Sequence, residues 1–452
     1  MHTNAEEHDT TVNLDQPPPI AAWKPWVFWG VPAVFYLLVQ MARNAPSSQE
    51  HALEQLTGGN AASIAMGMSL YFFTYAPLQL ICGRLLDTFG SRGLLAISAI
   101  ISAGGLLILA AADSTSLLAV SRLVVGAGSA IPFIACIFLA SIWHPPSRVA
   151  RVSGLTNTVG MAGSVMALST FPFLFTTVGW SISIYWLAGA TLLMAPILFL
   201  CVPKRPAWYL QRLEIRKDRR ESLGEGLRAL ARDKVVWMAG TAGGFLSLPV
   251  SVIGGLWGAR YLQSSGDFTL ASAGTIVALV FAGLGVGTLF FGWVCDRWKR
   301  KRLPLVIGGF GGAIATSLVI LIPAMPLGLL GGMVFLSGVC GGSLTVTYLF
   351  PVDSHPPSRR GVAIAFVNFL VMGLAGLFQW LVGVLLSWQL GGSTETAAVF
   401  IGLRNALLLV PIFMAIAGVI GVVIPERPNA ANVPHPLPHW VARWHGLRKR
   451  SA

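Results

Sequence analysis

The chain has 452 residues, of which 54% are hydrophobic and only 11% are charged, and its mean hydropathy is +0.69. Soluble globular proteins carry roughly a quarter charged residues, so the composition excludes an ordinary soluble protein and indicates a chain that lies mostly in lipid. The net charge of +13 comes from Lys and Arg placed between the apolar segments, as loop charges of membrane proteins are. We therefore expect the lipid bilayer, and no nucleic acid, as a partner.

The chain begins with a polar, acid-rich segment, 1–24, which lacks the apolar region of a signal peptide. Next come stretches without Asp, Glu, Lys or Arg, each long enough for one bilayer-spanning helix of roughly 20 residues. These stretches are 25–42, 55–83, 93–112, 123–147, 235–259, 268–295 and 361–394. The stretches 152–203 and 303–352 are about twice as long and break near their middles. With a last span at 396–425, the sequence predicts twelve transmembrane helices.

The basic residues predict the orientation of these helices. If the N-terminus is cytoplasmic, 27 of the 31 Lys and Arg fall in cytoplasmic segments. The opposite orientation would violate the positive-inside rule almost everywhere. We expect a multi-pass protein of the inner membrane with both termini in the cytoplasm. The five cysteines are scattered without paired spacing, so neither a disulfide framework nor a metal site is expected.

An internal duplication is the most informative feature of the organisation. The pentapeptide His-Pro-Pro-Ser-Arg at 144–148 recurs unchanged at 355–359, 211 residues later, and Asn157 and Asn368 lie the same distance apart. A third marker is a Gly and an Asp four residues apart, Gly83 with Asp87 and, 209 residues later, Gly292 with Asp296. Three matches at nearly one offset indicate two equivalent halves.

The expected fold is an all-α integral membrane protein with twelve transmembrane helices in two pseudo-symmetric six-helix bundles. The expected parts are a cytoplasmic tail, the first bundle, a connector, the second bundle and a basic tail, at 1–24, 25–203, 204–234, 235–425 and 426–452. In the connector, Trp208, Leu210 and Leu213 among Arg and Glu predict an amphipathic surface helix. Parallel repeats place a binding site between them near the bilayer midplane, where rocking of the halves exposes it to either side.

The loop between the second and third spans carries a family resemblance. Its residues Gly83, Asp87, Gly90 and Arg92 are similar to the signature G-x-L-a-D-r-x-G-r-k of the major facilitator superfamily, with Thr88 and Ser91 at two positions where that family has basic residues. The second half repeats the first glycine, the acid and the bases at Gly292, Asp296, Arg297 and Arg300. Lys299 stands where the second glycine of the signature would be. The resemblance extends over about 25–425 and implies this family's fold and transport activity.

These loop residues are candidate gating residues. A carboxylate at a helix end accepts hydrogen bonds from a neighbouring helix N-terminus and pairs with a nearby Arg, which would latch the cytoplasmic side in one state. The alternative is a plain turn whose charges face solvent. We favour the latch because the motif occurs at both copies of the duplication.

The fourth span resembles the same family. Arg122, Gly126 and Gly128 are similar to a pattern associated with its proton-coupled members. An Arg so far inside a span needs a wet cavity or a partner, and the glycines would permit close helix packing. The Gly-Pro dipeptide of the family's drug-proton antiporters is missing from 154–163, which makes drug efflux a lesser expectation.

Four arginines, Arg43, Arg122, Arg260 and Arg404, lie in or near spans and away from the cytoplasmic segments. The planar guanidinium suits a carboxylate or phosphate. Arg43 precedes Asp87 by 44 residues, the interval at which members of the family that carry organic anions often have an arginine. The alternative is that Arg43 and Arg260 snorkel to the outer headgroups, and the sequence does not decide between the cavity and that interface.

All 18 acidic residues fall outside the charge-free stretches, so the sequence lacks the buried carboxylate common in proton relays. Glu54 is the nearest carboxylate candidate. The remaining substrate-binding candidates are side chains that could orient a solute and an indole that could stack on it: Tyr75, Gln79, Asn157, Asn368, Gln379 and Trp257.

We expect a secondary active transporter, not an enzyme, that moves a small anionic organic solute by alternating access. The alternatives are a proton-coupled symporter of amino acids or dipeptides, and an exporter of a siderophore or drug. The expected partners are the solute and a coupling proton or counter-anion. No cofactor or metal is expected, and the protein should be a monomer.

Overall fold

The structure is a computed structural model that describes residues 21–206, 209, 223–266, 268–298, 300–322, 325–355, 359–393 and 395–426. Every regular element in these residues is a helix. Within the described part of the chain, twelve helical stretches are long and apolar enough to cross a membrane. This confirms the predicted all-α membrane fold with twelve spans.

The first half comprises nine helical elements among the described residues, of which α2 lies between the first two spans. These are α1 (Lys24–Asn44), the 3-10 turn η1 (Ala45–Ser48), α2 (Glu50–Thr57), α3 (Ala61–Phe89), α4 (Ser91–Ala110), α5 (Thr115–Ser129), α6 (Pro132–Trp143), α7 (Pro146–Thr177) and α8 (Trp180–Cys201). The fourth span comprises α5 and α6, because Pro132 interrupts the helical hydrogen bonds there. Gly90 and Gly179 stand between consecutive helices with φ of 81° and 87°, a conformation that glycine adopts without strain.

The second half follows the helix α10 (Leu223–Ala231). Its elements are α11 (Lys234–Leu246), the π-helix η2 (Pro249–Trp257), α12 (Gly258–Ser264), α13 (Leu270–Trp298), α14 (Arg302–Leu321), α15 (Leu327–Gly341), α16 (Leu344–Thr347), α17 (Leu349–Ser354), α18 (Arg360–Leu390), α19 (Thr396–Leu407) and α20 (Leu409–Val423). The seventh span is thus α11, η2 and α12 in series. A π-helical stretch inside a span is typical of functional regions.

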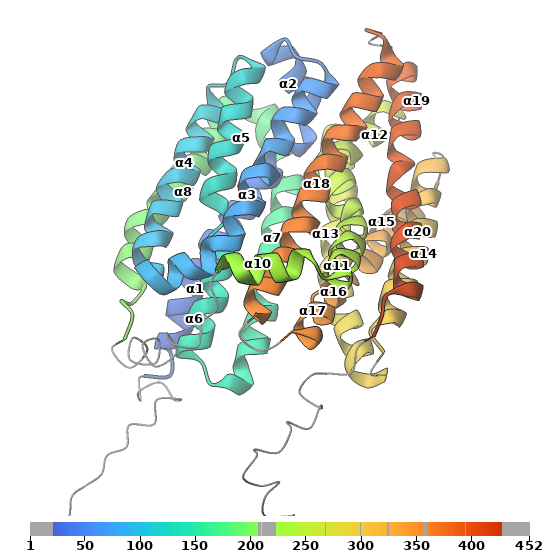
Figure 1. Cartoon of the computed structure of the whole chain (residues 1–452). Coiled ribbons are helices and arrows are strands. Elements are labelled where there is room, and N and C mark those ends of the chain that lie inside the picture. Colours follow the sequence, from blue (N-terminus) through green and yellow to red (C-terminus); the bar gives the residue numbers. More distant parts are fainter. Residues whose placement is uncertain are drawn as a thin grey trace, which may run out of the picture.

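The two halves stand side by side, with α10 crossing between them in the lower half of Figure 1. Across the interface α3 packs on α18 and α7 packs on α13. These two pairs are equivalent under the duplication. We call the end at which α10 lies the connector end, and the end at which α2 and α12 lie the α2 end.

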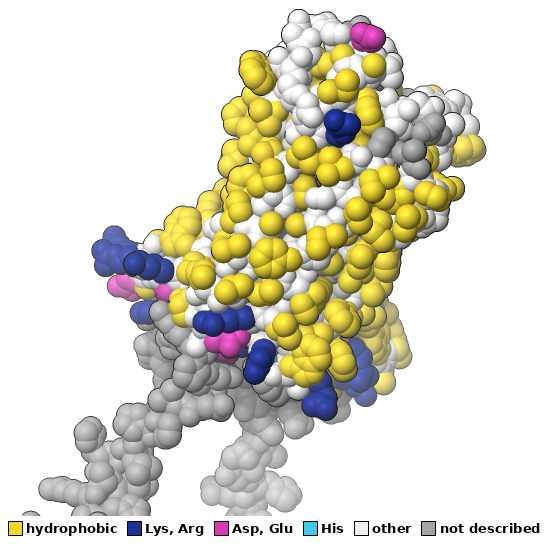
Figure 2. All heavy atoms as spheres, turned by 90° about the vertical axis from the view of Figure 1, so that its right-hand side faces the viewer, with side chains coloured by type: hydrophobic (Ala, Val, Ile, Leu, Met, Phe, Trp, Pro, Cys, Tyr) yellow, Lys and Arg dark blue, Asp and Glu magenta, His cyan; other side chains and the backbone are white. Residues whose placement is uncertain are grey.

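The lateral surface has the pattern of a membrane protein. Hydrophobic side chains cover the middle of the face in Figure 2, and Lys and Arg gather towards the connector end. Large apolar side chains such as Trp388 and Leu200 are 79% and 75% exposed. Such a band would be a liability in water and suits the lipid.

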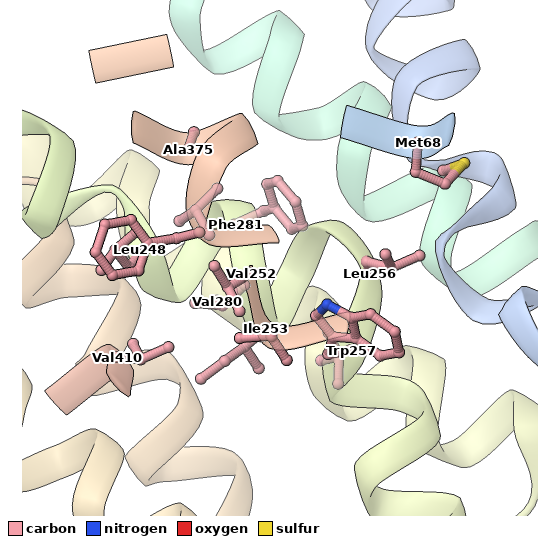
Figure 3. Close-up of a cluster of buried hydrophobic side chains, with 14 of the residues drawn as sticks. Met68, Leu248, Val252, Ile253, Leu256, Trp257, Val280, Phe281, Ala375 and Val410 are labelled. Atoms are coloured by element: carbon pink, nitrogen blue, oxygen red, sulfur yellow. The ribbon is translucent and has the colours of Figure 1, made fainter. Parts of the chain in front are cut away.

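Buried side chains around η2 connect the halves. Figure 3 shows Leu248, Val252, Ile253, Leu256 and Trp257 packed with Val280 and Phe281 of α13, near Met68 of α3. Because lipid tails are as apolar as these side chains, the stabilisation comes from close packing.

The predicted domain boundaries stay predictions. The expected surface helix with Trp208, Leu210 and Leu213 lies outside the described residues. The described part of the connector contains α10, whose Leu230 is buried with Val236 and Ala363. This contact ties the connector to the second half.

Candidate functional site

A cavity of about 1470 Å³ lies between the halves. Residues of α1, α3, α6 and α7 line it from the first half, and residues of η2, α13, α16 and α18 line it from the second. It extends from Gln40 and Arg43 to Arg84 and Thr88, which are exposed at the end of α3. The cavity therefore opens at the connector end.

The structure divides the predicted binding residues into two groups. Those that line the cavity are Arg43, Tyr75, Gln79, Asn157 and Asn368. Those that do not line it are Arg122, Arg260, Trp257 and Gln379.

Arg43 is in the last turn of α1 and is half-buried at the end of the cavity opposite its mouth. Its guanidinium carbon lies 4.7 Å from the ring centroid of Phe72 and 5.7 Å from that of Tyr71. Cation–π contacts of this kind hold an arginine without neutralising its charge. No carboxylate of the described residues pairs with it, so its charge is available to a solute.

Arg122, in α5, holds the end of α1 in place. It is 2% exposed and donates hydrogen bonds of 3.1 and 3.0 Å to the carbonyl oxygens of Ala42 and Arg43. The last carbonyls of a helix lack partners within the helix, and a buried guanidinium satisfies two of them here. Arg122 thus positions the backbone of Arg43.

The glycines that follow Arg122 allow this close approach. A Cβ at Gly126 would lie 2.4 Å from the carbonyl oxygen of Tyr71, and one at Gly128 would lie 2.6 Å from the amide nitrogen of Ser102. Both distances are too short for any side chain. The predicted close packing of the fourth span is confirmed.

Gln79 and Asn368 meet across the interface. The Asn368 side-chain amide donates to the amide oxygen of Gln79, and the Tyr348 hydroxyl donates to Asn368 over 2.8 Å. The two amides belong to α3 and α18. This polar bridge joins the halves inside the cavity and has to break if they separate there.

Tyr36 and Gln40 also line the cavity with Arg43, although neither was predicted from the sequence. Positions 36, 40 and 43 are spaced by four and three residues, so they share one face of α1. Once Arg43 was singled out, this spacing was the signal that could have identified both.

Several contacts close the α2 end. The Arg260 guanidinium donates to both oxygens of Glu54 at 2.7 and 3.0 Å, joining α12 to α2. The Ser47 hydroxyl donates to the carbonyl oxygen of Gly255 in η2. The amide of Ala62 donates to the hydroxyl of Ser387 over 2.9 Å. Each of these contacts connects one half to the other.

Trp257 and Gln379 belong to the same closed region. Trp257 is fully buried, and its indole nitrogen donates to the carbonyl oxygen of Gln379 over 3.0 Å. This hydrogen bond connects η2 with α18 inside the second half. Arg404 is half-buried in α19 and does not line the cavity.

Small residues bring the halves together at the α2 end. A Cβ at Gly274 of α13 would lie 2.5 Å from the carbonyl oxygen of Leu168 in α7. One at Gly383 of α18 would lie 2.4 Å from the Cβ of Ala65 in α3. Towards the connector end, Gly285 and Gly361 have nothing within 4 Å of the corresponding position. The interface is tight at one end and open at the other.

At the connector end, the signature loop of the first half is bound to the end of the sixth span and to the first residues of the connector. The Tyr209 hydroxyl donates to a carboxylate oxygen of Asp87 over 3.0 Å, and Arg205 donates to the Asp87 carbonyl oxygen. Arg92 donates to the Phe199 carbonyl oxygen and covers the Phe199 ring at 4.4 Å. These contacts bind the loop to the sixth span and to the start of the connector, while Gly83 and Asp87 also line the cavity.

The equivalent loop of the second half uses acids that our sequence analysis did not single out. Lys301 forms an ion pair with Asp353, and a carboxylate oxygen of Glu426 accepts hydrogen bonds from the amides of Lys301 and Arg302 at the start of α14. Arg297 and Arg300 are exposed, and Gly292 is half-buried with open space beside it. The side chain of Asp296 lies outside the described residues.

Comparisons with known proteins agree with this architecture. The family model described as Major Facilitator Superfamily matches residues 32–379 and 241–451. The chain is 22% identical over 304 residues to "Uncharacterized transporter YybO" of Bacillus subtilis, covering 60% of this chain and 68% of that protein. It is 27% identical over 245 residues to the cis,cis-muconate transport protein of Acinetobacter baylyi, covering 51% of this chain and only 56% of that protein.

Solved structures show the same fold at low sequence identity. A bacterial homologue of the human lysosomal transporter Spinster, in an inward-facing and occupied conformation, aligns with a TM-score of 0.74 at 15% identity, over 90% of this chain and 97% of that one. The nucleoside transporter NupG aligns with a TM-score of 0.70 at 14% identity, over 88% and 100% of the two chains. The family match covers most of the sequence, and the chain belongs to the Major Facilitator Superfamily as a multi-pass secondary transporter of small solutes rather than an enzyme.

Proposed function

We propose that the protein moves a small organic anion across the inner membrane by alternating access, and that Arg43 binds the anionic group. The single observation that carries this proposal is the half-buried Arg43 guanidinium, which lines the cavity without a carboxylate partner among the described residues. A charge in a membrane interior is costly and marks a substrate pathway or binding site. A bound anion would neutralise it.

The charge distribution supports a cytoplasmic connector end. Lys and Arg gather there on the face in Figure 2, and basic loops remain on the cytoplasmic side of a membrane. With that orientation both termini are cytoplasmic. The cavity opens inward, and the pair of Arg260 with Glu54 closes the outer side. Release of that pair and closure of the connector end would give the outward-facing state.

The distant likeness to a muconate transport protein favours an organic acid as substrate. Proton-coupled symport of amino acids or dipeptides is the second candidate. Of the described residues that line the cavity, Asp87 is the one carboxylate, and it lies near the mouth. A zwitterion would leave its ammonium group without an acidic partner beside Arg43, which favours the anion. Export of a siderophore or drug stays a third candidate, and we expect a monomer.

Uptake into proteoliposomes tests the proposal. The purified protein would be assayed with labelled monocarboxylates, dicarboxylates, sugar phosphates and dipeptides, with and without a pH gradient. Arg43→Gln should reduce anion uptake more than about tenfold, because a charge-assisted hydrogen bond contributes roughly 1.5–3 kcal/mol. Arg404→Gln, outside the cavity, is the matched control. Wild-type protein that carries none of these anions would refute the proposal.

A further inference from the structure

The two walls of the cavity differ in their hydrogen-bonding capacity. In the first half, the side chains of Tyr36, Gln40, Tyr75 and Asn157 line the cavity and have no hydrogen-bond partner among the described residues. Together with Arg43 they form a polar group, which we call the head-group site. Unpartnered polar groups of this kind gain stabilisation when a ligand supplies the missing bonds.

In the second half, the hydroxyl hydrogens of the serine and threonine side chains that line the cavity already donate to backbone carbonyls. Ser247 and Ser251 donate to the carbonyl oxygens of Gly244 and Ser247. Thr288 and Thr345 donate to those of Leu284 and Gly342. These four side chains line the cavity but donate to their own backbone.

Apart from those hydroxyls and the hydrogen-bonded pair of Tyr348 and Asn368, the second half presents mostly hydrocarbon. We call this surface the apolar wall, and it consists of Val250, Phe281, Leu284, Leu344, Met372 and Ala375. Phe133 and Ile134 of α6 add further apolar surface from the first half. A sugar or a peptide would bring hydroxyl or amide groups against this wall, whose side chains offer them no hydrogen bonds.

The cavity offers one cation at its inner end. The other described charged lining residues are Arg84 and Asp87. They follow Phe72, which contacts Arg43, by 12 and 15 residues along α3, a rise of about 18 and 22 Å. A small solute held by Arg43 does not reach either. A second carboxylate on that solute would therefore have no second cation within reach to neutralise it.

We infer that the substrate is an amphipathic monocarboxylate, an organic acid with one anionic group and a hydrocarbon or aromatic body. The carboxylate lies in the head-group site, and the body lies against the apolar wall. This inference rests on the proposed function and narrows it, since it places dicarboxylates, sugar phosphates and dipeptides among the poor substrates.

Competition for uptake distinguishes the two levels of the proposal. Benzoate is the monocarboxylate probe, with muconate, glucose 6-phosphate and dialanine as the other arms. Benzoate should inhibit uptake of a labelled anion at a concentration at least about tenfold lower than the other three compounds do. This is expected where a site leaves the extra polar groups of a ligand unpaired. Met372→Gln, which keeps the side-chain length but adds an amide, should reduce this preference for benzoate about fivefold or more. Met372→Leu, which stays apolar, should leave it within about twofold.

The possible outcomes separate the claims. If muconate or glucose 6-phosphate is carried in an Arg43-dependent way and benzoate is not, the monocarboxylate inference is wrong while the proposed function stands. If no anion is carried, both fail. Equal effects of Met372→Gln and Met372→Leu on the preference would also overturn the assignment of the apolar wall.

Discussion

Arg260 and Glu54 form a two-pronged ion pair between the halves, with both hydrogen bonds at 3.0 Å or less. Their side chains are only 10% and 14% exposed. A guanidinium and a carboxylate in this parallel arrangement make the strongest kind of ion pair. Because the pair lies at the end opposite the cavity mouth, its energy contributes only to the state in which that end is closed.

We expect Arg260→Gln to favour opening of the α2 end. Removing one partner of a buried ion pair costs roughly 3–5 kcal/mol, and that cost falls on the closed state. Spin labels would be placed at Leu56 and Trp388, which are exposed near this end in α2 and α18, in a background without the five native free cysteines. The distance between the labels should be longer in Arg260→Gln than in the protein with Arg260. The charge reversal Glu54→Arg with Arg260→Glu should restore the short distance. An unchanged distance in Arg260→Gln would contradict this role.

Gly274 should be sensitive to the smallest substitution. Gly274→Ala places a methyl group 2.5 Å from the Leu168 carbonyl oxygen, so α7 and α13 have to separate at the α2 end. Overpacking of this kind typically costs 1–3 kcal/mol. We expect fewer closed molecules in the same spin-label measurement. Gly285→Ala on the same helix, where nothing lies within 4 Å, is the control, and equal behaviour of the two variants would rule out the clash.

Arg122 should affect stability more than charge recognition. Arg122→Gln frees the carbonyl oxygens of Ala42 and Arg43, and each buried group left without a partner costs roughly 1–3 kcal/mol. A lower apparent melting temperature in detergent is the expected result. The exposed Arg151 provides the control, because Arg151→Gln should leave the melting temperature unchanged. A stable Arg122→Gln protein that has lost all anion binding would instead place Arg122 in the site.

His144 should make stability fall in acid. Burial, with Arg148 nearby, lowers the pKa of His144 from its ordinary value of 6.5, and its ring packs edge-on against Trp26 at 5.1 Å. The folded protein then binds this proton less readily than the unfolded chain. The contribution of His144 to the free energy of unfolding is complete above pH 6.5. It is lost as the pH falls towards the lower pKa that His144 has in the folded state.

Apparent melting temperatures from about pH 8 to about pH 5 would test this, because histidine titrates in that range. His144→Gln should flatten the decline. Arg148→Gln, which removes the repelling charge, should reduce it in part. If the decline is the same in all three proteins, another group is responsible for it.

Some of this organisation followed from the sequence. The twelve spans were predicted because a helix that crosses lipid needs a long run of apolar residues without charge. The paired halves followed from the repeated pentapeptide at 144–148 and 355–359. The close packing around Gly126 followed from small residues at a helix interface. These features depend on local composition or on self-similarity, which a sequence contains in full.

The contacts of the individual arginines could not be predicted from the sequence. Arg43 and Arg122 are both arginines within apolar spans, yet one faces the cavity and the other binds the backbone of α1. Which way each points depends on where α5 packs against α1. The gating roles of the signature residues and the domain boundaries stay predictions.

The sequence by itself determined that the chain crosses a membrane in two homologous sets of helices, because hydropathy and internal repeats depend only on the order of the residues. Only the tertiary structure decided which charges meet. Arg260 and Glu54 are 206 residues apart, and Gln79 and Asn368 are 289 apart. Such partners are set by the docking of the two halves, whose geometry depends on the packing of all the helices at once.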